Sequence, residues 1–139
     1  MLCPTDIELT RQRRYLFLMN LPHPSTDQIT LPNVLAALGD ATRLAIIGCL
    51  ARCDQSDGLV CGQLHGLTSK TNLTYHVAKL RDAGVVNVRQ EGTKRRITLR
   101  RGDLDQRFPG FLDSVIVSAI DLPAVETTMR ELGVETSCP

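Results

Sequence analysis

The hydrophobic period of the chain changes at Gly84, and this change restricts the possible folds more than any other feature. Before Gly84, apolar residues recur every three or four positions, which is the spacing of one face of a helix. After Gly84, residues 85–90 and 96–100 are rich in β-branched residues and enclose a glycine-containing tip at 91–93, which predicts a β-hairpin. The sequence therefore predicts several helices followed by a two-stranded hairpin.

Capping and terminating residues define the helices. The predicted order before the hairpin is a helix over residues 31–38 with Thr30 as its cap and Gly39 as its end, a helix capped by Asp40, a turn at 54–58, a short helix over about 59–66, and a longer helix from Thr68 or Ser69 to about Ala83. Beyond the hairpin, a last helix is predicted over residues 111–122 and a short one around 124–132. The predicted fold class is mainly α with one β-hairpin (α+β).

The chain has 139 residues, the length of one domain. Residues 30–122 form the predicted folded domain, residues 1–29 an N-terminal extension that is loose or a short helix, and residues 123–139 an acidic C-terminal tail. An ordinary N-terminal sequence follows Met19, so residues 1–18 are interpreted either as an over-long reading frame or as a genuine helix. An odd number of cysteines without an evident secretory signal favours reduced thiols and a cytoplasmic location. No apolar stretch reaches the roughly 18 residues of a membrane helix, so no membrane partner is predicted.

Charge is distributed unevenly along the chain. The total of 16 Lys and Arg against 15 Asp and Glu leaves a net charge of +1, which taken alone argues against nucleic acid. Residues 70–101, however, hold nine basic and two acidic residues, whereas residues 102–139 hold two basic and seven acidic ones. The basic block coincides with the longer helix and the hairpin, so it predicts a local cationic surface on these two elements.

This order of elements, in which two helices joined by a tight connection precede a basic hairpin, is typical of a winged helix-turn-helix. The longer helix is then the recognition helix, whose N-terminal half enters a major groove of DNA. Thr and Asn can meet base edges, Lys can meet phosphate or guanine, and cations of the hairpin can reach nearby phosphates or a minor groove. For Tyr75, packing against the hairpin is the alternative to a phosphate contact. The predicted DNA-binding residues are Ser69, Lys70, Thr71, Asn72, Thr74, Tyr75, His76, Lys79, Arg89, Thr93, Lys94 and Arg95, with Arg96 beside them.

Four segments carry a family pattern: residues 34–47 (VLAALGDATRLAII), 68–86 (TSKTNLTYHVAKLRDAGVV), 91–96 (EGTKRR) and 107–113 (RFPGFLD). In this order they resemble the ArsR/SmtB-type bacterial repressors, although Ala41 stands where proline is usual. The resemblance implies a homodimeric winged-helix repressor whose dimer interface is built by the predicted first and last helices, residues 31–38 and 111–122. It also implies a palindromic operator in double-stranded DNA, from which an inducer releases the protein. Within this family the histidine of the recognition helix, His76, is a DNA-facing or turn-packing residue.

The usual metal sites of this family are not repeated in the sequence. The thiol site needs Leu-Cys-Val-Cys-Asp-Leu in the short third helix, but Val60 and Gly62 stand at the two cysteine positions. The zinc site needs histidines in the last helix, and no histidine follows His76. Redox members pair a cysteine near the position of Cys49 with a cysteine in the last helix, which has none. No cofactor is therefore predicted, and metal salts are not expected to release DNA through these sites.

Two alternative functions were compatible with the same residues. Thiol-based metal or redox sensing would use Cys49 with Cys53, Cys61 with His65, or a cluster of the three cysteines, because residues four apart share a helix face. A winged helix that contacts only proteins would need the apolar core but not the exposed cations. Enzymatic activity is not expected, since the sequence has neither a glycine-rich phosphate loop after a strand nor a Gly-x-Ser-x-Gly motif.

Overall fold

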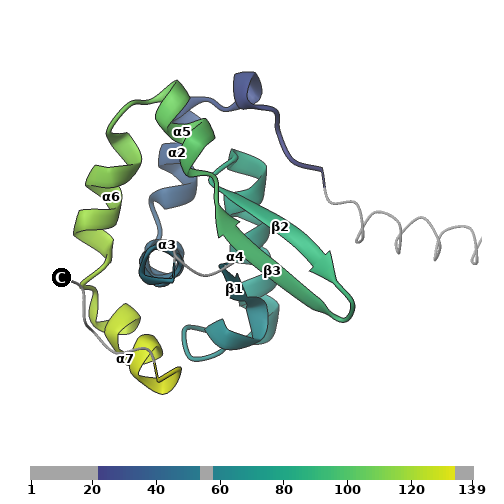
Figure 1. Cartoon of the computed structure of the whole chain (residues 1–139), viewed down its shortest axis with the longest axis vertical. Helices are drawn as coiled ribbons and strands as arrows, with labels where there is room; N and C mark the ends of the chain where they lie inside the picture. The colour runs from purple at the N-terminus through teal and green to yellow at the C-terminus, as the bar shows by residue number, and fades with distance from the viewer. Residues whose placement is uncertain (1–21, 54–57, 134–139) are drawn as a thin grey trace, which may run out of the picture.

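The computed structural model describes residues 22–53 and 58–133. Its elements are the 3-10 turn η1 (Thr26–Gln28), α2 (Leu31–Leu38), α3 (Ala41–Arg52), β1 (Leu59–Val60), the 3-10 turn η2 (Cys61–Leu64), α4 (Lys70–Ala83), β2 (Val86–Glu91), β3 (Lys94–Leu99), α5 (Arg101–Arg107), α6 (Phe111–Ala119) and α7 (Pro123–Glu131). The sheet is antiparallel with the order β1-β3-β2, and β2 and β3 form the wing. Figure 1 shows α3 end-on near the centre, with α6 and α7 on one side and α4 and the sheet on the other. The fold is the predicted winged helix-turn-helix.

Helix α3 forms the centre of the domain. The Asp40 side chain accepts a hydrogen bond from the Arg43 amide (3.1 Å), which confirms the predicted cap. Residues 45–50 are all buried, since α3 packs against α4, α6, α7 and the sheet. Gly48 permits a close approach to α6, because a Cβ there would lie 2.6 Å from the Ala119 carbonyl oxygen. Among the described residues no single helix is long and apolar enough to cross a bilayer; α2 and α3 reach that length only together, as a pair bent by 98°.

The predicted bounds of α2 and α4 are confirmed. Helix α2 spans the predicted residues, although the Thr30 hydroxyl at its N-cap makes no capping hydrogen bond. Helix α4 begins after Ser69, whose hydroxyl accepts a hydrogen bond from the Asn72 amide (3.3 Å). It ends at Gly84, whose φ of 86° is the left-handed conformation that terminates many helices. The apolar residues of α4 that recur at intervals of three or four positions are buried in the core: Leu73, Val77 and Leu80.

The predicted short helix at 59–66 is wrong. Leu59 and Val60 instead form strand β1, in which they pair with Ile97 and Arg96 of β3. Only the single 3-10 turn η2 follows this strand before the loop that leads to α4. This segment is therefore joined to strand β3 of the wing by backbone pairing and does not form a helix of its own.

The C-terminal part also differs from the prediction. Helix α5 was not predicted, and its one buried residue is Leu104. Helix α6 ends at Ala119, three residues earlier than predicted, whereas α7 follows after a short turn and confirms the short helix predicted around 124–132. Helix α7 packs on α3 and fully buries Val125 and Met129. The segment expected as an acidic tail therefore begins with a helix of the packed domain, and its end, residues 134–139, lies outside the described residues.

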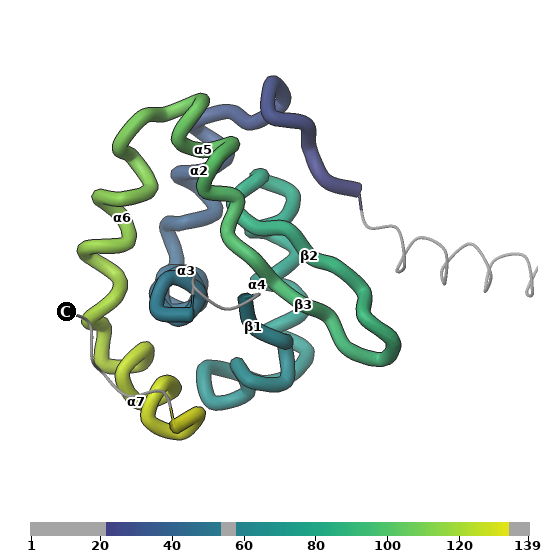
Figure 2. The backbone as a smooth tube through the Cα atoms, in the orientation of Figure 1, coloured from purple at the N-terminus to yellow at the C-terminus, as the bar shows by residue number. Residues whose placement is uncertain are grey.

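Residues 22–29, which we call the strap, pass from the start of α2 along α5 to the outer side of β2 (Figure 2). His23 Nε2 accepts a hydrogen bond from the Val88 amide (2.9 Å), which lies on the edge of β2 that has no neighbouring strand. Ile29 is 1% exposed, and its carbonyl accepts a hydrogen bond from Arg107 (2.9 Å). The strap is therefore held against the folded domain, a contact that the prediction of a loose extension or a short helix did not include. The alternatives for the first 18 residues fall outside the described part of the chain.

Candidate nucleic-acid interface

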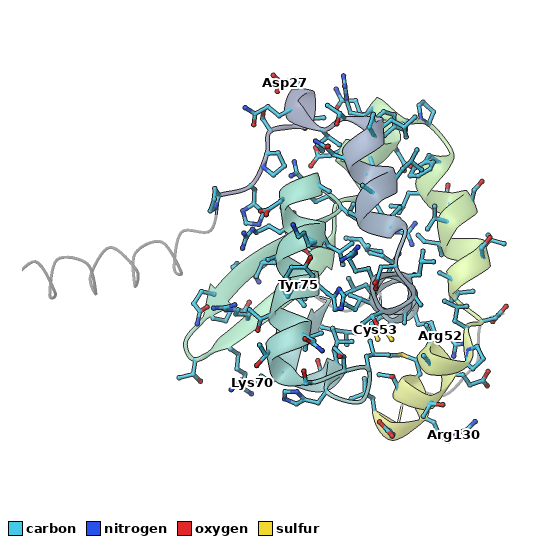
Figure 3. All side chains as sticks on the ribbon, turned by 180° about the vertical axis from the view of Figure 1, so that it is seen from behind. Asp27, Arg52, Cys53, Lys70, Tyr75 and Arg130 are labelled. Carbon is cyan, nitrogen blue, oxygen red and sulfur yellow. The ribbon has the colours of Figure 1, made fainter. Side chains whose placement is uncertain are left out.

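One side of α4 exposes most of the predicted DNA-binding residues, because its buried stripe occupies the opposite side. Figure 3 shows Lys70 at the start of this helix and Tyr75 further along it. The Tyr75 side chain is 55% exposed, and the Lys79 ammonium lies 5.4 Å from the centre of its ring, within reach of a cation–π contact. The exposed predicted residues on or next to α4 are Ser69, Lys70, Thr71, Asn72, Thr74, Tyr75 and Lys79.

His76 points toward α3 rather than to the exposed side of α4. Its side chain is 14% exposed, and Nδ1 lies 3.2 Å from an Arg43 guanidinium nitrogen and 3.8 Å from the Asp40 carboxylate. Arg43 also donates a hydrogen bond to the Ala37 carbonyl of α2. The hydrogen bond from the Arg43 amide holds the pKa of Asp40 below its usual range. His76 thus corresponds to the packing alternative of the sequence prediction, and it joins the recognition helix to α2 and α3.

Glu91 engages two of the arginines of the wing. The strand register places Arg89 opposite Arg96 and Glu91 opposite Lys94, so these four side chains share one face. The Glu91 carboxylate accepts hydrogen bonds from Arg96 Nε (2.9 Å) and Arg89 Nε (3.1 Å), which hold its pKa below the usual range. Arg89, predicted to contact phosphate, is therefore paired with a carboxylate in the free protein, whereas Lys94 is exposed. Sequence reasoning missed this pairing, although the spacing of Arg89 and Glu91 on one strand face was a signal for it.

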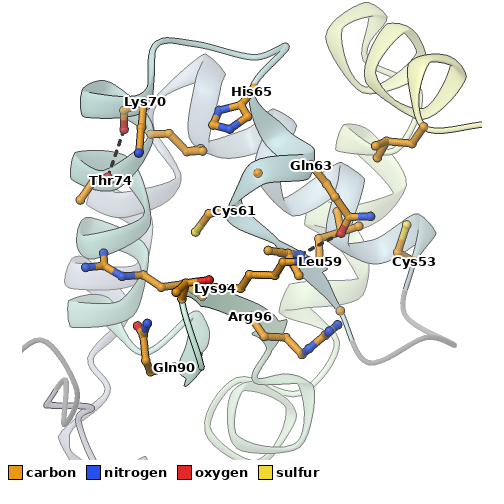
Figure 4. A pocket seen from close by; sticks show the side chains of 17 residues that line it. Cys53, Leu59, Cys61, Gln63, His65, Lys70, Thr74, Gln90, Lys94 and Arg96 are labelled. Atoms are coloured by element: carbon orange, nitrogen blue, oxygen red, sulfur yellow. Dashed lines mark hydrogen bonds between the residues drawn. The ribbon is translucent and has the colours of Figure 1, made fainter.

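A hollow of about 960 Å³ lies between α4, η2 and the wing (Figure 4). The buried side chains of Leu59 and Leu73 contribute to its lining, and Gln90 and Thr74 add uncharged polar groups. Its cationic lining consists of Lys70, Lys94, Arg95 and Arg96, His65 also lines it, and none of its described lining residues is acidic. The predicted wing residues Thr93, Lys94 and Arg95 all line it. The cations of the recognition helix and of the wing therefore face a common space, where anionic groups such as DNA phosphates are favoured.

Cys49 and Cys53 lie in the core side of α3, away from this hollow or at its margin. Cys49 is fully buried, and burial raises the pKa of its thiol to about 12. The Cys53 sulfur lies 3.8 Å from the Met129 sulfur of α7, and burial also raises its pKa. Burial therefore favours the protonated form of both thiols, which is the weaker nucleophile.

Cys61 lines the hollow, but its predicted pairing with His65 on one helix face is not formed. The turn η2 ends at Leu64, and His65 lies exposed just beyond it. Burial raises the pKa of the Cys61 thiol, while the nearby charge of Arg95 acts in the opposite direction. Within residues 22–53 and 58–133, no three Cys, His, Asp or Glu side chains gather where they could hold a metal ion. The described structure thus does not assemble Cys49, Cys53 and Cys61 into one thiol cluster.

Comparisons with known proteins agree with this geometry. A family model described as a helix-turn-helix domain matches residues 38–89, the region that runs from the end of α2 into β2 and includes α3, η2 and α4. The uncharacterized HTH-type transcriptional regulator YceK of Bacillus subtilis (strain 168) is 33% identical over 93 residues, which cover 66% of this chain and 90% of the relative. The chain belongs to the family of helix-turn-helix transcriptional regulators, which bind DNA.

Proposed function

We propose that this regulator is a homodimeric repressor of the ArsR/SmtB type that binds a palindromic operator. The N-terminal half of α4 enters the major groove, and the wing lies on the neighbouring backbone. The observation that carries this proposal is the hollow between α4 and the wing, since its described lining includes Lys70, Lys94 and Arg95 and no acidic side chain. These cations bind phosphates whatever the sequence, while Asn72 and Thr74, exposed on α4, meet base edges. The protein acts where bacterial DNA lies, in the cytoplasm.

Exposed apolar side chains on α2 and α6 support a dimer. Leu31 and Leu35 of α2 are 39% and 51% exposed, and Val117 of α6 is 73% exposed. Both helices pack against α3, so both flank the same central helix. An apolar hollow of about 280 Å³ lies on α6, lined by Leu44, Phe111, Ser114, Val115, Ser118, Ala119 and Leu122. A second copy related by a twofold axis would cover these side chains and set the spacing of two recognition helices to two half-sites.

The dimer is tested by placing a charge in the proposed interface. Val117→Glu should convert the dimer to a monomer in sedimentation equilibrium, because a carboxylate would be desolvated there. Its affinity for a two-half-site operator should fall at least about tenfold, since the linked second half-site contact is lost. Thr127→Glu, an exposed position on α7, is the control and should remain dimeric. A wild-type protein that sediments as a monomer at micromolar concentration would overturn this part of the proposal.

We further propose that the protein is released from its operator by an inducer other than a metal ion bound at the family's usual sites. The supporting observation is that Val60 and Gly62 occupy the thiol positions of those sites, while the aligned segment is a strand end and a 3-10 turn rather than a helix. Operator binding should therefore persist in excess zinc or arsenite, measured by fluorescence anisotropy of labelled duplex. Release of the duplex by either salt would contradict this assignment and would point to the thiols as sensors.

DNA binding itself is tested with the full chain in two steps. Fluorescence anisotropy against a random-sequence duplex at two salt concentrations should show binding that weakens steeply as salt rises. Selection from a library of random duplexes should then enrich a palindromic site, and this site placed in a reporter promoter should lower expression. Absence of binding even at low salt would favour a winged helix that contacts proteins. Activation of the reporter would keep DNA binding but refute the repressor role.

A further inference from the structure

The hydroxyl of Thr74 is used by the helix that carries it. Thr74 Oγ1 donates a hydrogen bond to the Lys70 carbonyl oxygen one turn earlier (3.0 Å), as the dashed line in Figure 4 shows. Threonine in a helix commonly forms this bond, which fixes the side-chain torsion. A hydroxyl has a single proton, so this one is no longer available to another acceptor. The exposed surface of Thr74 therefore offers its γ-methyl group and an oxygen that can only accept, and it cannot donate to the acceptors of guanine or thymine.

The base edges in the major groove differ in whether they present an apolar group that such a methyl group can contact. Guanine presents two acceptors, and adenine presents one acceptor and one donor. Thymine presents one acceptor and the 5-methyl group, the apolar feature that an aliphatic side chain can contact. Thr74 lies five residues into α4, in the half of the helix that enters the groove, and its neighbours Thr71 and Tyr75 are also exposed. A contact between two methyl groups removes apolar surface of both from water and leaves no polar group without a hydrogen-bond partner.

We propose that Thr74 is a specificity-determining residue that recognises a thymine through the thymine 5-methyl group. This inference rests on the proposed function, in that α4 is the element that enters the major groove. Lys70 supports the contact in two ways, because its carbonyl holds the Thr74 hydroxyl and its side chain lines the cationic hollow beside it. Sequence selectivity at this position then comes from apolar contact and not from a hydrogen bond donated to a base.

The test removes the methyl group from either partner. The operator selected with wild-type protein is resynthesised with deoxyuridine in place of each thymine in turn, and affinity is measured by anisotropy. For the wild type, one of these single substitutions in either half-site should weaken binding about threefold to fivefold, as expected for the loss of one buried methyl group. Thr74→Ser, which keeps the hydroxyl, should bind the thymine and uracil operators equally. Thr74→Val, which keeps a methyl group and lacks the hydroxyl, should retain the preference for thymine.

Thr127→Ser is the matched control, because Thr127 is exposed on α7 and its hydroxyl donates the same type of hydrogen bond, to the Pro123 carbonyl (3.0 Å). This variant should keep the full penalty for uracil. The proposal is overturned if no thymine methyl group affects wild-type binding, or if Thr74→Ser keeps the penalty for uracil. It is also overturned if Thr74→Val loses this penalty, which would indicate that the base is read through the hydroxyl. Each of these results still requires selective DNA binding, whereas failure of the proposed function would leave no selected site. Far-UV circular dichroism verifies that each variant is folded.

Discussion

Replacing Glu91 by Gln should strengthen binding of the protein to DNA of any sequence. In the free protein the Glu91 carboxylate accepts hydrogen bonds from both Arg89 and Arg96 of the wing. A DNA phosphate must compete with this carboxylate for the same guanidinium groups. Glutamine keeps an oxygen acceptor of similar reach but removes the negative charge, so Arg89 becomes available at the position where the backbone of DNA is proposed to lie.

The magnitude follows from counterion release. The slope of log K against log salt is negative, and each additional phosphate that the protein neutralises makes it steeper by about 0.9. If Arg89 then gains one phosphate contact, the slope of the Glu91→Gln variant should be steeper than the wild-type slope by that amount. Lowering salt fourfold, from about 200 to about 50 mM, should then raise the ratio of variant to wild-type affinity about 3.5-fold.

The assay is anisotropy of a labelled random duplex over this range of salt, followed by the same titration with the selected operator. Asp105→Asn on α5, an exposed position that changes the net charge equally, is the control and should leave the slope unchanged. The discrimination between operator and random duplex should not improve in the variant, because phosphate contacts carry no sequence information. A slope equal to that of the wild type would refute the claim that Glu91 holds Arg89 away from phosphate.

Three further predictions concern the recognition helix, the wing and the core. Lys94→Ala and Arg95→Ala should each weaken binding to all sequences alike and reduce the salt slope by about 0.9, which the same titrations measure. Asn72→Ala should reduce discrimination at one base pair by about 1–3 kcal/mol, and unchanged discrimination in competition binding would show that α4 is misassigned as the reading element. Gly84→Ala should lower the free energy of unfolding by about 1–3 kcal/mol in urea titrations, because φ is positive and the new Cβ would lie 2.5 Å from a buried side chain of the strap. Gly102→Ala, where a Cβ meets open space, should not be destabilised.

Local signals account for the elements that the sequence predicted. Asp40, Ser69 and Gly84 mark helix ends through hydrogen bonds and a backbone angle that involve only neighbouring residues. The two residues of β1 carry no such signal, since Leu59 becomes a strand residue through pairing with Ile97, far along the chain. Helix α5 lacks one as well, because it begins without a side-chain cap and buries a single residue. Elements that depend on distant partners were therefore the ones predicted wrongly or missed.

The candidate site divides in the same way. Helical periodicity separates the exposed residues of α4 from the buried ones, so Lys70, Asn72 and Thr74 could be selected from spacing alone. The orientation of His76 depends on Arg43, which the fold brings from the start of α3. The involvement of Glu91 with arginines on both strands depends on the register of the wing. Sequence thus predicts which elements form the surface, while tertiary contacts determine which of its charged groups are available.

The strap also affects what counts as an independently folding unit. The region that matches the helix-turn-helix family, residues 38–89, includes neither the strap nor α5. His23 of the strap contacts β2, and Arg107 of α5 contacts Ile29 of the strap. A shortened chain beginning at Thr30 would expose the amide of Val88 on an unprotected strand edge. Exposed strand edges pair readily with the edges of other chains, so such a truncation should aggregate even though its recognition helix is complete. We therefore expect the strap to shield this strand edge from β-pairing between molecules.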